Sequence, residues 1–277
     1  MSGNVEAPQE SGGWQLEGRG PEAYEAYLVP KFFRPWAERL VSVAGTAEGE
    51  RMLDVGCGTG IVARSAAPHV GDRGRVVGVD LNRAMLETAR REGAHLTPEV
   101  EWRQEDATEL SFEDDTFDLA LSQQVLQFVS DPTKLLAELR RVVRPGGRVG
   151  LNVLRPIQHN PSYEILAEVL ERHVGEESGA MIRSPFPEWS GATLRELMGE
   201  AGFDRISLLL DIRPVRYPSA EEYLRQEAAS SPLAASIAGT NETVRTKMVD
   251  RLEEAFEAYT DRDGVVFPME THLVMAS

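Results

Sequence analysis

The chain has 277 residues, enough for one large domain or for one domain with a small appendage. It carries 29 lysines and arginines against 45 aspartates and glutamates, and the net charge of −16 disfavours binding to nucleic acid or to an anionic membrane. No apolar run approaches the ~20 residues of a membrane span, the N-terminus lacks a signal-peptide pattern, and the single cysteine, Cys57, excludes an internal disulfide or a cysteine-built zinc site. We therefore expect a cytoplasmic protein with no membrane, nucleic-acid or metal partner.

The N-terminal region divides into two parts. Residues 1–20 are rich in Gly, Ser, Glu and Gln without a period, which predicts a flexible tail. From Pro21 onward, aromatic and aliphatic residues recur near helical spacing, so we expect one or two short helices that end at Gly45.

Residues 51–154 alternate between apolar runs typical of buried strands and amphipathic segments typical of helices. We expect the helix that begins at Ile61 to end at Pro68, and Asp131 to cap a later helix. This alternation predicts βαβ units and a mostly parallel sheet. The expected strands cover residues 52–55, 75–80, 100–104, 117–121 and 148–154.

The alternation breaks after the fifth strand. Residues 156–189 contain one amphipathic helix and a loop, and residues 217–262 are again helical. Connections that follow strand C-termini lie on the ligand side of an open α/β sheet, so we interpret both segments as a helical lid that binds substrate. The alternative is that they only thicken the core. With both segments assigned to the lid, the core comprises residues 21–155, 190–216 and 263–277, including a sixth strand over 203–212 and a last strand over 265–275.

A glycine-rich loop with the sequence DVGCGTG joins the first strand to the first helix. Its glycines, Gly56, Gly58 and Gly60, let the backbone turn sharply and approach a ligand closely. Asp80 ends the second strand, where a carboxylate can accept hydrogen bonds from both hydroxyls of a ribose. The pattern therefore predicts a ligand that contains a nucleoside.

Two kinds of nucleoside ligand fit this loop. Residues 58–63 match G-x-G-x-x-A, which allows a dinucleotide and hence an NAD-dependent oxidoreductase. Asp54, however, would repel a pyrophosphate and suits a cation, and Asp106 with Ala107 can read an adenine amino group. A ligand with an amino-acid tail, a sulfonium and an adenosine suits all three acidic positions, so we favour S-adenosylmethionine.

Five segments resemble the class I S-adenosylmethionine-dependent methyltransferases, closest to their ubiquinone/menaquinone-type and small-molecule branch. They are DVGCGTG, GVDLN, EDATEL, LSQQVLQFV and LRRVVRPGGRVGLNV, and the resemblance covers roughly residues 20–155. It implies a Rossmann-like α/β fold with a seven-stranded, mostly parallel sheet, helices on both faces and a helical lid. The last strand would run antiparallel between the fifth and the sixth.

The resemblance also implies roles at the cofactor. The three loop glycines would bound the methionine end, and Asp54 would hold the ammonium group. Asp80 would hold the ribose while Leu81 packs on the adenine, whose edge Asp106 and Ala107 would read. The remaining candidates would face the methionine moiety or close over the cofactor: Ser122, Gln123, Tyr24 and Tyr27.

The expected reaction is in-line methyl transfer to a carbon, oxygen or nitrogen nucleophile of a small molecule such as a quinone, an aromatic compound or another secondary metabolite. A base is needed only if the acceptor must lose a proton. His159 is the first candidate, with the alternative that it is a loop histidine bonded to backbone. Loss of methyl transfer or non-methylating chemistry on the same cofactor remains an alternative, and we expect a monomer or a homodimer. The candidate walls for the acceptor are Phe186, Trp189, Tyr217 and Phe267.

Overall fold

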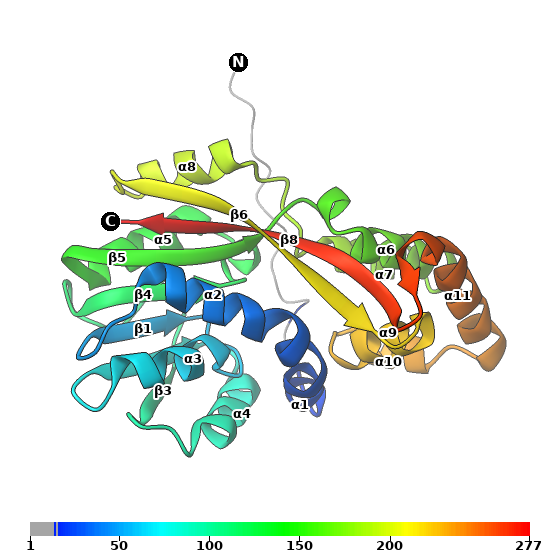
Figure 1. Ribbon diagram of the computed structural model, residues 1–277, viewed down its shortest axis with the longest axis horizontal. Helices are drawn as coiled ribbons and strands as arrows, with labels where there is room; N and C mark the ends of the chain where they lie inside the picture. Colours follow the sequence, from blue (N-terminus) through cyan, green and yellow to red (C-terminus); the bar gives the residue numbers. More distant parts are fainter. Residues whose placement is uncertain (1–13, 15) are drawn as a thin grey trace.

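The computed structural model describes Trp14 and residues 16–277, and its centre is a sheet with the strand order β3-β2-β1-β4-β5-β8-β6 (Figure 1). β1 to β5 pair in parallel, whereas β8 is antiparallel to both β5 and β6. The predicted Rossmann-like sheet is confirmed, including a last long strand inserted between the fifth and the sixth. The strands are β1 Arg51–Val55, β2 Arg75–Asp80, β3 Val100–Gln104, β4 Phe117–Gln123, β5 Val143–Leu154, β6 Ile206–Tyr217 and β8 Gly264–Ala276.

Helices cover both faces of this sheet because alternate strand residues point to opposite sides. Met52 and Val76 pack with α2 (Arg34–Ala44) and α3 (Ile61–Val70), while Leu53 packs with α5 (Pro132–Val142) and α8 (Gly191–Glu200). α4 (Arg83–Gly93) contacts β2 and β3. Asp131 accepts a hydrogen bond from the backbone of Lys134, so the predicted cap of α5 is confirmed.

Several local boundaries differ from those expected, including the start of β5 at Val143 and the end of β6 at Tyr217. α3 continues through Pro68 to Val70, although Pro68 cannot donate the usual helical hydrogen bond to the carbonyl of Arg64. β6 begins at Ile206, because Phe203 is buried against the sheet after α8 instead of joining the strand. A two-residue strand, β7 (Thr260–Asp261), pairs with β8 inside a segment predicted to be helical.

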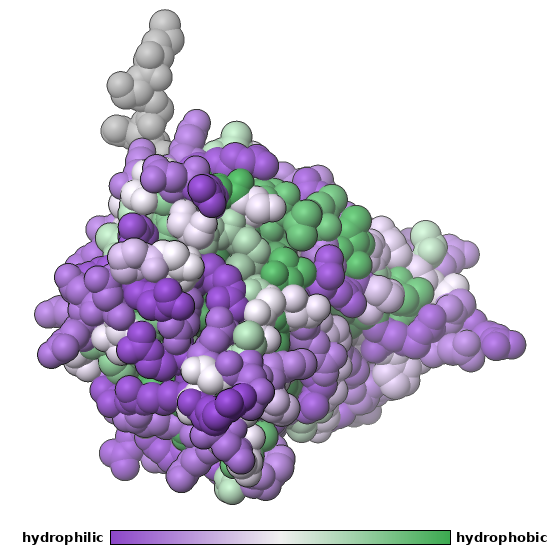
Figure 2. Space-filling view, turned by 60° about the vertical axis from the view of Figure 1, so that its left-hand side comes forward, coloured by the Kyte–Doolittle hydropathy of each residue, from purple (hydrophilic) through white to green (hydrophobic). Residues whose placement is uncertain are grey.

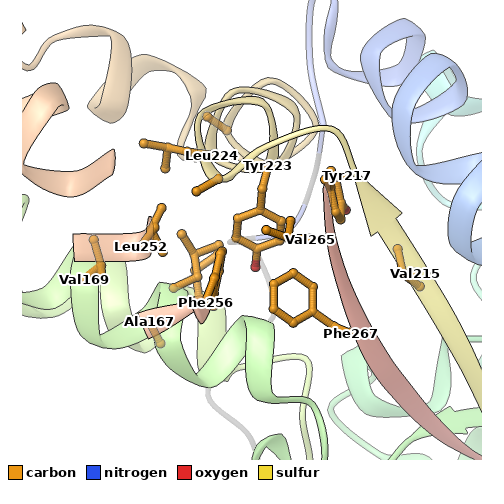
Figure 3. Packing of buried hydrophobic residues seen from close by; sticks show 14 of the residues in the cluster. Ala167, Val169, Val215, Tyr217, Tyr223, Leu224, Leu252, Phe256, Val265 and Phe267 are labelled. Atoms are coloured by element: carbon orange, nitrogen blue, oxygen red, sulfur yellow. The ribbon is translucent and has the colours of Figure 1, made fainter. Parts of the chain in front are cut away.

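A third core lies beyond the parallel sheet, where β6 and β8 extend together as far as the pair Tyr217–Val265. Figure 3 shows Tyr223, Phe256 and Phe267 meeting there, with ring centroids 4.5–5.8 Å apart. The long strands thus carry a helical part on an apolar base. Its helices are α6 Pro161–His173, α7 Glu176–Arg183, α9 Ala220–Ala229, α10 Ala234–Ala238 and α11 Glu242–Ala255.

The N-terminal segment leads from the helical part to the sheet. α1 (Gly20–Ala23) continues into the π-helix η2 (Tyr24–Phe33) and then into α2, which ends at Gly45 as expected. Leu16 is buried and its carbonyl accepts a hydrogen bond from Asn82, so the packed chain begins before residue 20. The rest of the predicted tail, residues 1–13 and 15, lies outside the described residues.

The described part of the chain contains no helix that is long and apolar enough to cross a membrane. The surface in Figure 2 is mostly hydrophilic, with apolar side chains gathered near the middle of that face. Exposed apolar residues include Leu209, Leu210 and Ile212 of the edge strand β6.

Candidate cofactor and acceptor site

One cavity of about 360 Å³ lies at the carboxyl ends of the parallel strands. Loops that follow β1, β2, β3 and β4 line one side of it, and η2, α6, α7 and α9 contribute the other. In a doubly wound sheet these loops meet at the point where strand order reverses, here between β1 and β4, which is where such folds bind ligands. The cavity therefore joins the sheet to the helical part.

The glycine loop forms the floor of this cavity, and its three glycines differ in what they do. All three have positive φ angles, of 67°, 55° and 85° for Gly56, Gly58 and Gly60. A Cβ on Gly56 would lie 2.3 Å from Val125, and one on Gly60 would lie 2.2 Å from Trp102. A Cβ on Gly58 would meet no atom within 4 Å. Gly58 therefore leaves open space for a ligand, whereas Gly60 is required by packing and does not line the cavity.

Asp54 is a buried carboxylate at the edge of the loop. Its Oδ2 accepts a hydrogen bond from the backbone of Ala63 at 2.9 Å, and its buried Oδ1 has no partner among the described residues. Burial raises the pKa of Asp54 to about 7, against the opposing effect of the Ala63 hydrogen bond. An unsatisfied carboxylate oxygen in a cavity is costly, so this position suits a cationic donor.

Asp80 stands across the loop at the end of β2. Its oxygens accept backbone hydrogen bonds from Gly58 at 2.7 Å and Asn82 at 2.8 Å, which fix the carboxylate and leave further lone pairs. Burial raises its pKa, which these two hydrogen bonds oppose. Leu81 follows with 57% of its surface exposed, although it is apolar. The pair offers acceptors for hydroxyl groups beside an apolar platform.

Asp106 and Ala107 line the cavity after β3. Asp106 Oδ1 accepts hydrogen bonds from the backbone and the hydroxyl of Thr108, each at 2.8 Å. Gln123 also lines the cavity; its amide donates to the carbonyl of Phe33, and its buried Oε1 has no partner in the described chain. Ser122 instead points away and donates to the carbonyl of Val55 at 2.9 Å, so it joins two strands.

The two candidate tyrosines of η2 separate. Tyr24 lines the cavity and stacks on Phe33 with a centroid distance of 4.8 Å. Burial, with the neighbouring carboxylates, raises its pKa. An ion pair of 2.7 Å between Glu25 and Arg64 of α3 holds this turn. Tyr27 lies outside the cavity, where its hydroxyl accepts a hydrogen bond from Arg225.

His159 is not among the residues that line the cavity, which removes the geometric basis for the predicted base. Its side chain is 39% exposed, and its ring nitrogens face Arg155 at 3.0 Å and Glu270 at 3.8 Å. Of the candidate walls, Phe186 lines the cavity, while the others are core residues or pack against the core. The predicted residues that do line it are Tyr24, Asp54, Gly56, Gly58, Asp80, Leu81, Asp106, Ala107 and Gln123.

Sequence reasoning missed most of the side of the cavity away from the glycine loop. Gln124 has a positive φ of 58° and accepts hydrogen bonds from Gln127 and the backbone of Leu154. Both Gln124 and Gln127 lie in the segment LSQQVLQ, but glutamines that bind a ligand have no characteristic spacing in a sequence. Other lining residues that were missed come from separate elements and include Phe32, Trp36, Tyr163, Glu227, Ser230, Ser231 and Met269.

Comparison with known proteins places the chain in a family. Residues 53–151 match the family model described as "Methyltransferase domain". The chain is 30% identical over 190 residues to the ubiquinone/menaquinone biosynthesis C-methyltransferase UbiE of Vibrio vulnificus, covering 63% of this chain and 72% of that protein. It therefore belongs to the class I S-adenosylmethionine-dependent methyltransferases. Its branch is that of the ubiquinone/menaquinone-type and small-molecule methyltransferases, as predicted.

Other relatives are matched over a smaller part of their length. A 2-phytyl-1,4-naphtoquinone methyltransferase of Trichormus variabilis is 36% identical over 120 residues, which cover 43% of this chain and 52% of that protein. An uncharacterized transposon protein of Streptomyces fradiae is 41% identical over 116 residues, 42% of this chain and 33% of that one. The chain thus spans about half of the length of the first of these relatives and a third of the length of the second.

Solved structures share the fold at low sequence identity. The YcgJ protein of Bacillus subtilis aligns with a TM-score of 0.58 at 19% identity, covering 87% of this chain and 97% of that one. A Haemonchus contortus phosphoethanolamine N-methyltransferase, solved with S-adenosylhomocysteine, aligns with a TM-score of 0.57 at 22% identity, covering 93% of this chain and 56% of that one. These likenesses support the fold.

Proposed function

We propose that this protein transfers a methyl group from S-adenosylmethionine to a nucleophile of an apolar small molecule. The observation that carries the proposal is the pair of carboxylates at the glycine loop, the buried Asp54 and the half-buried Asp80, which bonds the open backbone at Gly58. A cationic nucleoside with vicinal hydroxyls matches both groups. Family membership supports the same cofactor.

The cavity fits this cofactor residue by residue. Asp54 Oδ1, which is buried without a partner in the described chain, would accept from the ammonium group. Asp80 would accept from the ribose hydroxyls, and the exposed Leu81 would pack on the adenine. Asp106 and Ala107 would read the adenine edge at the wall formed after β3. Bound S-adenosylmethionine supplies an electrophilic methyl group on a cationic sulfur.

The residues of this chain would then position the acceptor and exclude water. Phe32, Tyr163, Ile182, Phe186 and Met269 give the far side of the cavity an apolar, largely aromatic lining. Such a lining favours a small apolar acceptor over a large polar one. Alignment in an enclosed site can supply up to ~7–11 kcal/mol of the barrier reduction.

The helical part serves as the lid of this site. Tyr163 on α6, Ile182 on α7 and Glu227 on α9 all reach the cavity, which supports a substrate-binding role for 156–189 and 217–262. The net charge of −16 supports a free small molecule rather than nucleic acid as acceptor. We place the protein in the cytoplasm and expect it to be a monomer or a homodimer. Light scattering after size-exclusion chromatography would distinguish the two oligomeric states.

Calorimetry tests the cofactor directly. The purified protein should bind S-adenosylhomocysteine and S-adenosylmethionine, and Asp80→Asn should weaken both. Asp72→Asn, a change of an exposed aspartate, is the matched control and should leave binding unchanged. Radiolabelled methyl transfer to a panel of apolar aromatic acceptors then tests the activity. Failure of the wild-type protein to bind either cofactor form would disprove the proposal.

A further inference from the structure

A buried carboxylate on α9 faces the acceptor side of the cavity and has no role at the cofactor. Glu227 is 5% exposed and lines the cavity together with Ser230 and Ser231, one turn further along. Its Oε2 accepts a hydrogen bond from the hydroxyl of Tyr163 at 2.9 Å, and its Oε1 accepts one from Tyr217. Each oxygen keeps a further lone pair that a ligand can use.

The surroundings of Glu227 are aromatic and separate it from the cofactor end. Phe32 lies 6.2 Å from the ring of Tyr163, and Phe186 lies 5.1 Å from the same ring. Tyr24, which stacks on Phe33, lines the same cavity. Burial and the charges of Asp80 and Asp54 raise the pKa of Tyr24, whereas burial, Glu227 and Tyr24 raise the pKa of Tyr163. An acceptor placed among these rings would have the cofactor on one side and Glu227 on the other.

The charges near Glu227 indicate what kind of group it receives. Lys31 of η2 is the facing cation: its ammonium lies 4.5 Å from the ring centroid of Tyr217 and hydrogen-bonds Gln226. Tyr223 bonds the backbone of Ser162 instead. Because the nearby charge of Lys31 already favours the ionised carboxylate and would repel a second cation, a neutral hydroxyl that donates a hydrogen bond suits this position better than a cationic acceptor.

We propose that Glu227 is a catalytic base that takes the proton from a weakly acidic, phenol-like hydroxyl of an apolar aromatic acceptor. This inference rests on the proposed function. The hydroxyl proton passes to a Glu227 oxygen, and the acceptor oxygen forms its bond to the methyl carbon. The carbon–sulfur bond breaks and its electron pair stays on sulfur. The products are a methyl ether, a neutral thioether and a protonated Glu227.

The protonation behaviour of this site is consistent with that role. Burial raises the pKa of Glu227 to about 6, while the hydroxyls of Tyr163 and Tyr217 and the charge of Lys31 oppose the increase. The carboxylate is thus ionised near neutral pH and has a higher proton affinity than an exposed glutamate. Tyr163 and Tyr217 act as positioning residues that hold both oxygens in place.

The test uses naphthol and its methyl ether as probes, with the full-length protein saturated with S-adenosylhomocysteine. Wild-type protein should bind naphthol about tenfold to hundredfold more tightly than methoxynaphthalene at pH 7.5, as expected for a hydrogen bond to a charged group. Glu227→Gln should reduce this preference to less than about tenfold, because a neutral acceptor replaces the charged one, and leave S-adenosylhomocysteine affinity unchanged. Glu221→Gln, at an exposed position of the same helix, is the control and should behave as wild type.

A second readout separates catalysis from a structural role. With S-adenosylmethionine, wild-type protein should form methoxynaphthalene at a rate that falls below pH about 6. Tyr217→Phe removes a donor to the charged carboxylate and should move this midpoint to higher pH, which loss of packing would not do. This variant also keeps the proposal testable if Glu227→Gln fails to fold.

Three results would overturn the inference: equal binding of naphthol and its ether to wild-type protein, methylation at a ring carbon, or an unshifted acid limb in Tyr217→Phe. Each of these can occur while the wild-type protein binds S-adenosylhomocysteine normally, in which case the proposed function stands without this role for Glu227. Loss of cofactor binding by the wild-type protein would instead disprove the proposed function.

Discussion

Replacing Asp54 by asparagine should stabilise the ligand-free protein and weaken its binding of the cofactor. Burial disfavours the ionised form of Asp54 in the folded state and raises its pKa from 3.8 to about 7. Each pH unit is worth about 1.36 kcal/mol, so the ionised side chain costs about 4 kcal/mol above pH 7. Asparagine keeps an oxygen for the Ala63 hydrogen bond and carries no charge.

The sign of the pH dependence follows from the two pKa values. Below pH about 4, Asp54 is protonated in both folded and unfolded protein and the cost vanishes. Between pH 4 and 7 the unfolded chain ionises while the folded one does not, so the cost grows with pH and then stays constant. The advantage of Asp54→Asn should therefore be about 4 kcal/mol at pH 8 and about 2 kcal/mol at pH 5.5.

Thermal and chemical denaturation at these two pH values measure the difference, with Asp72→Asn as the control. A chain of this size gains about 2–4 °C in melting temperature per kcal/mol. Asp54→Asn should also bind S-adenosylhomocysteine about tenfold to hundredfold more weakly, because a hydrogen bond to a charged group is lost. Equal destabilisation at both pH values would show that the Asp54 carboxylate is satisfied in the folded protein and refute the reasoning.

Three further outcomes follow from the cavity. The affinity of the wild-type protein for S-adenosylhomocysteine should be constant above pH 7. Below pH 7 it should fall by up to about tenfold per pH unit, because the ligand must then displace a proton from Asp54. Calorimetry measures this affinity, and a pH-independent affinity would show that Asp54 does not contact the ligand. Gly60→Ala should lower the free energy of unfolding by about 1–3 kcal/mol because its Cβ would overlap Trp102. Gly58→Ala should weaken cofactor binding more than it lowers the free energy of unfolding. A larger loss of stability for Gly58→Ala, or a larger loss of cofactor affinity for Gly60→Ala, would contradict these glycine roles. Ser122→Ala should cost about 1 kcal/mol of stability with unchanged cofactor affinity, and a selective loss of affinity would restore Ser122 to the site.

Sequence alone determined the sheet and the cofactor end of the cavity. The alternation of apolar runs and amphipathic segments fixes βαβ units, whose right-handed crossovers bring the carboxyl ends of the strands to one edge. The glycine loop, Asp80 and Asp106 follow three such strands, so their convergence required no knowledge of long-range packing. Ser122 and Gln123 are adjacent at the end of β4, and successive side chains of a strand point to opposite faces. Ser122 therefore bonds the neighbouring strand, whereas Gln123 lines the cavity.

The tertiary structure decided the acceptor side. Tyr163, Tyr217 and Glu227 come from α6, β6 and α9, and no local spacing relates three residues on separate elements. Glu227 lies on a helix with charged residues around it, where its burial depends on how α9 packs over β6 and η2. His159 was placed on the correct side of the sheet by its position after β5, but its pairing with Arg155 turns it away from the cavity. Side-chain direction in the connecting segments depends on packing between distant elements, and that packing exists only in the folded chain.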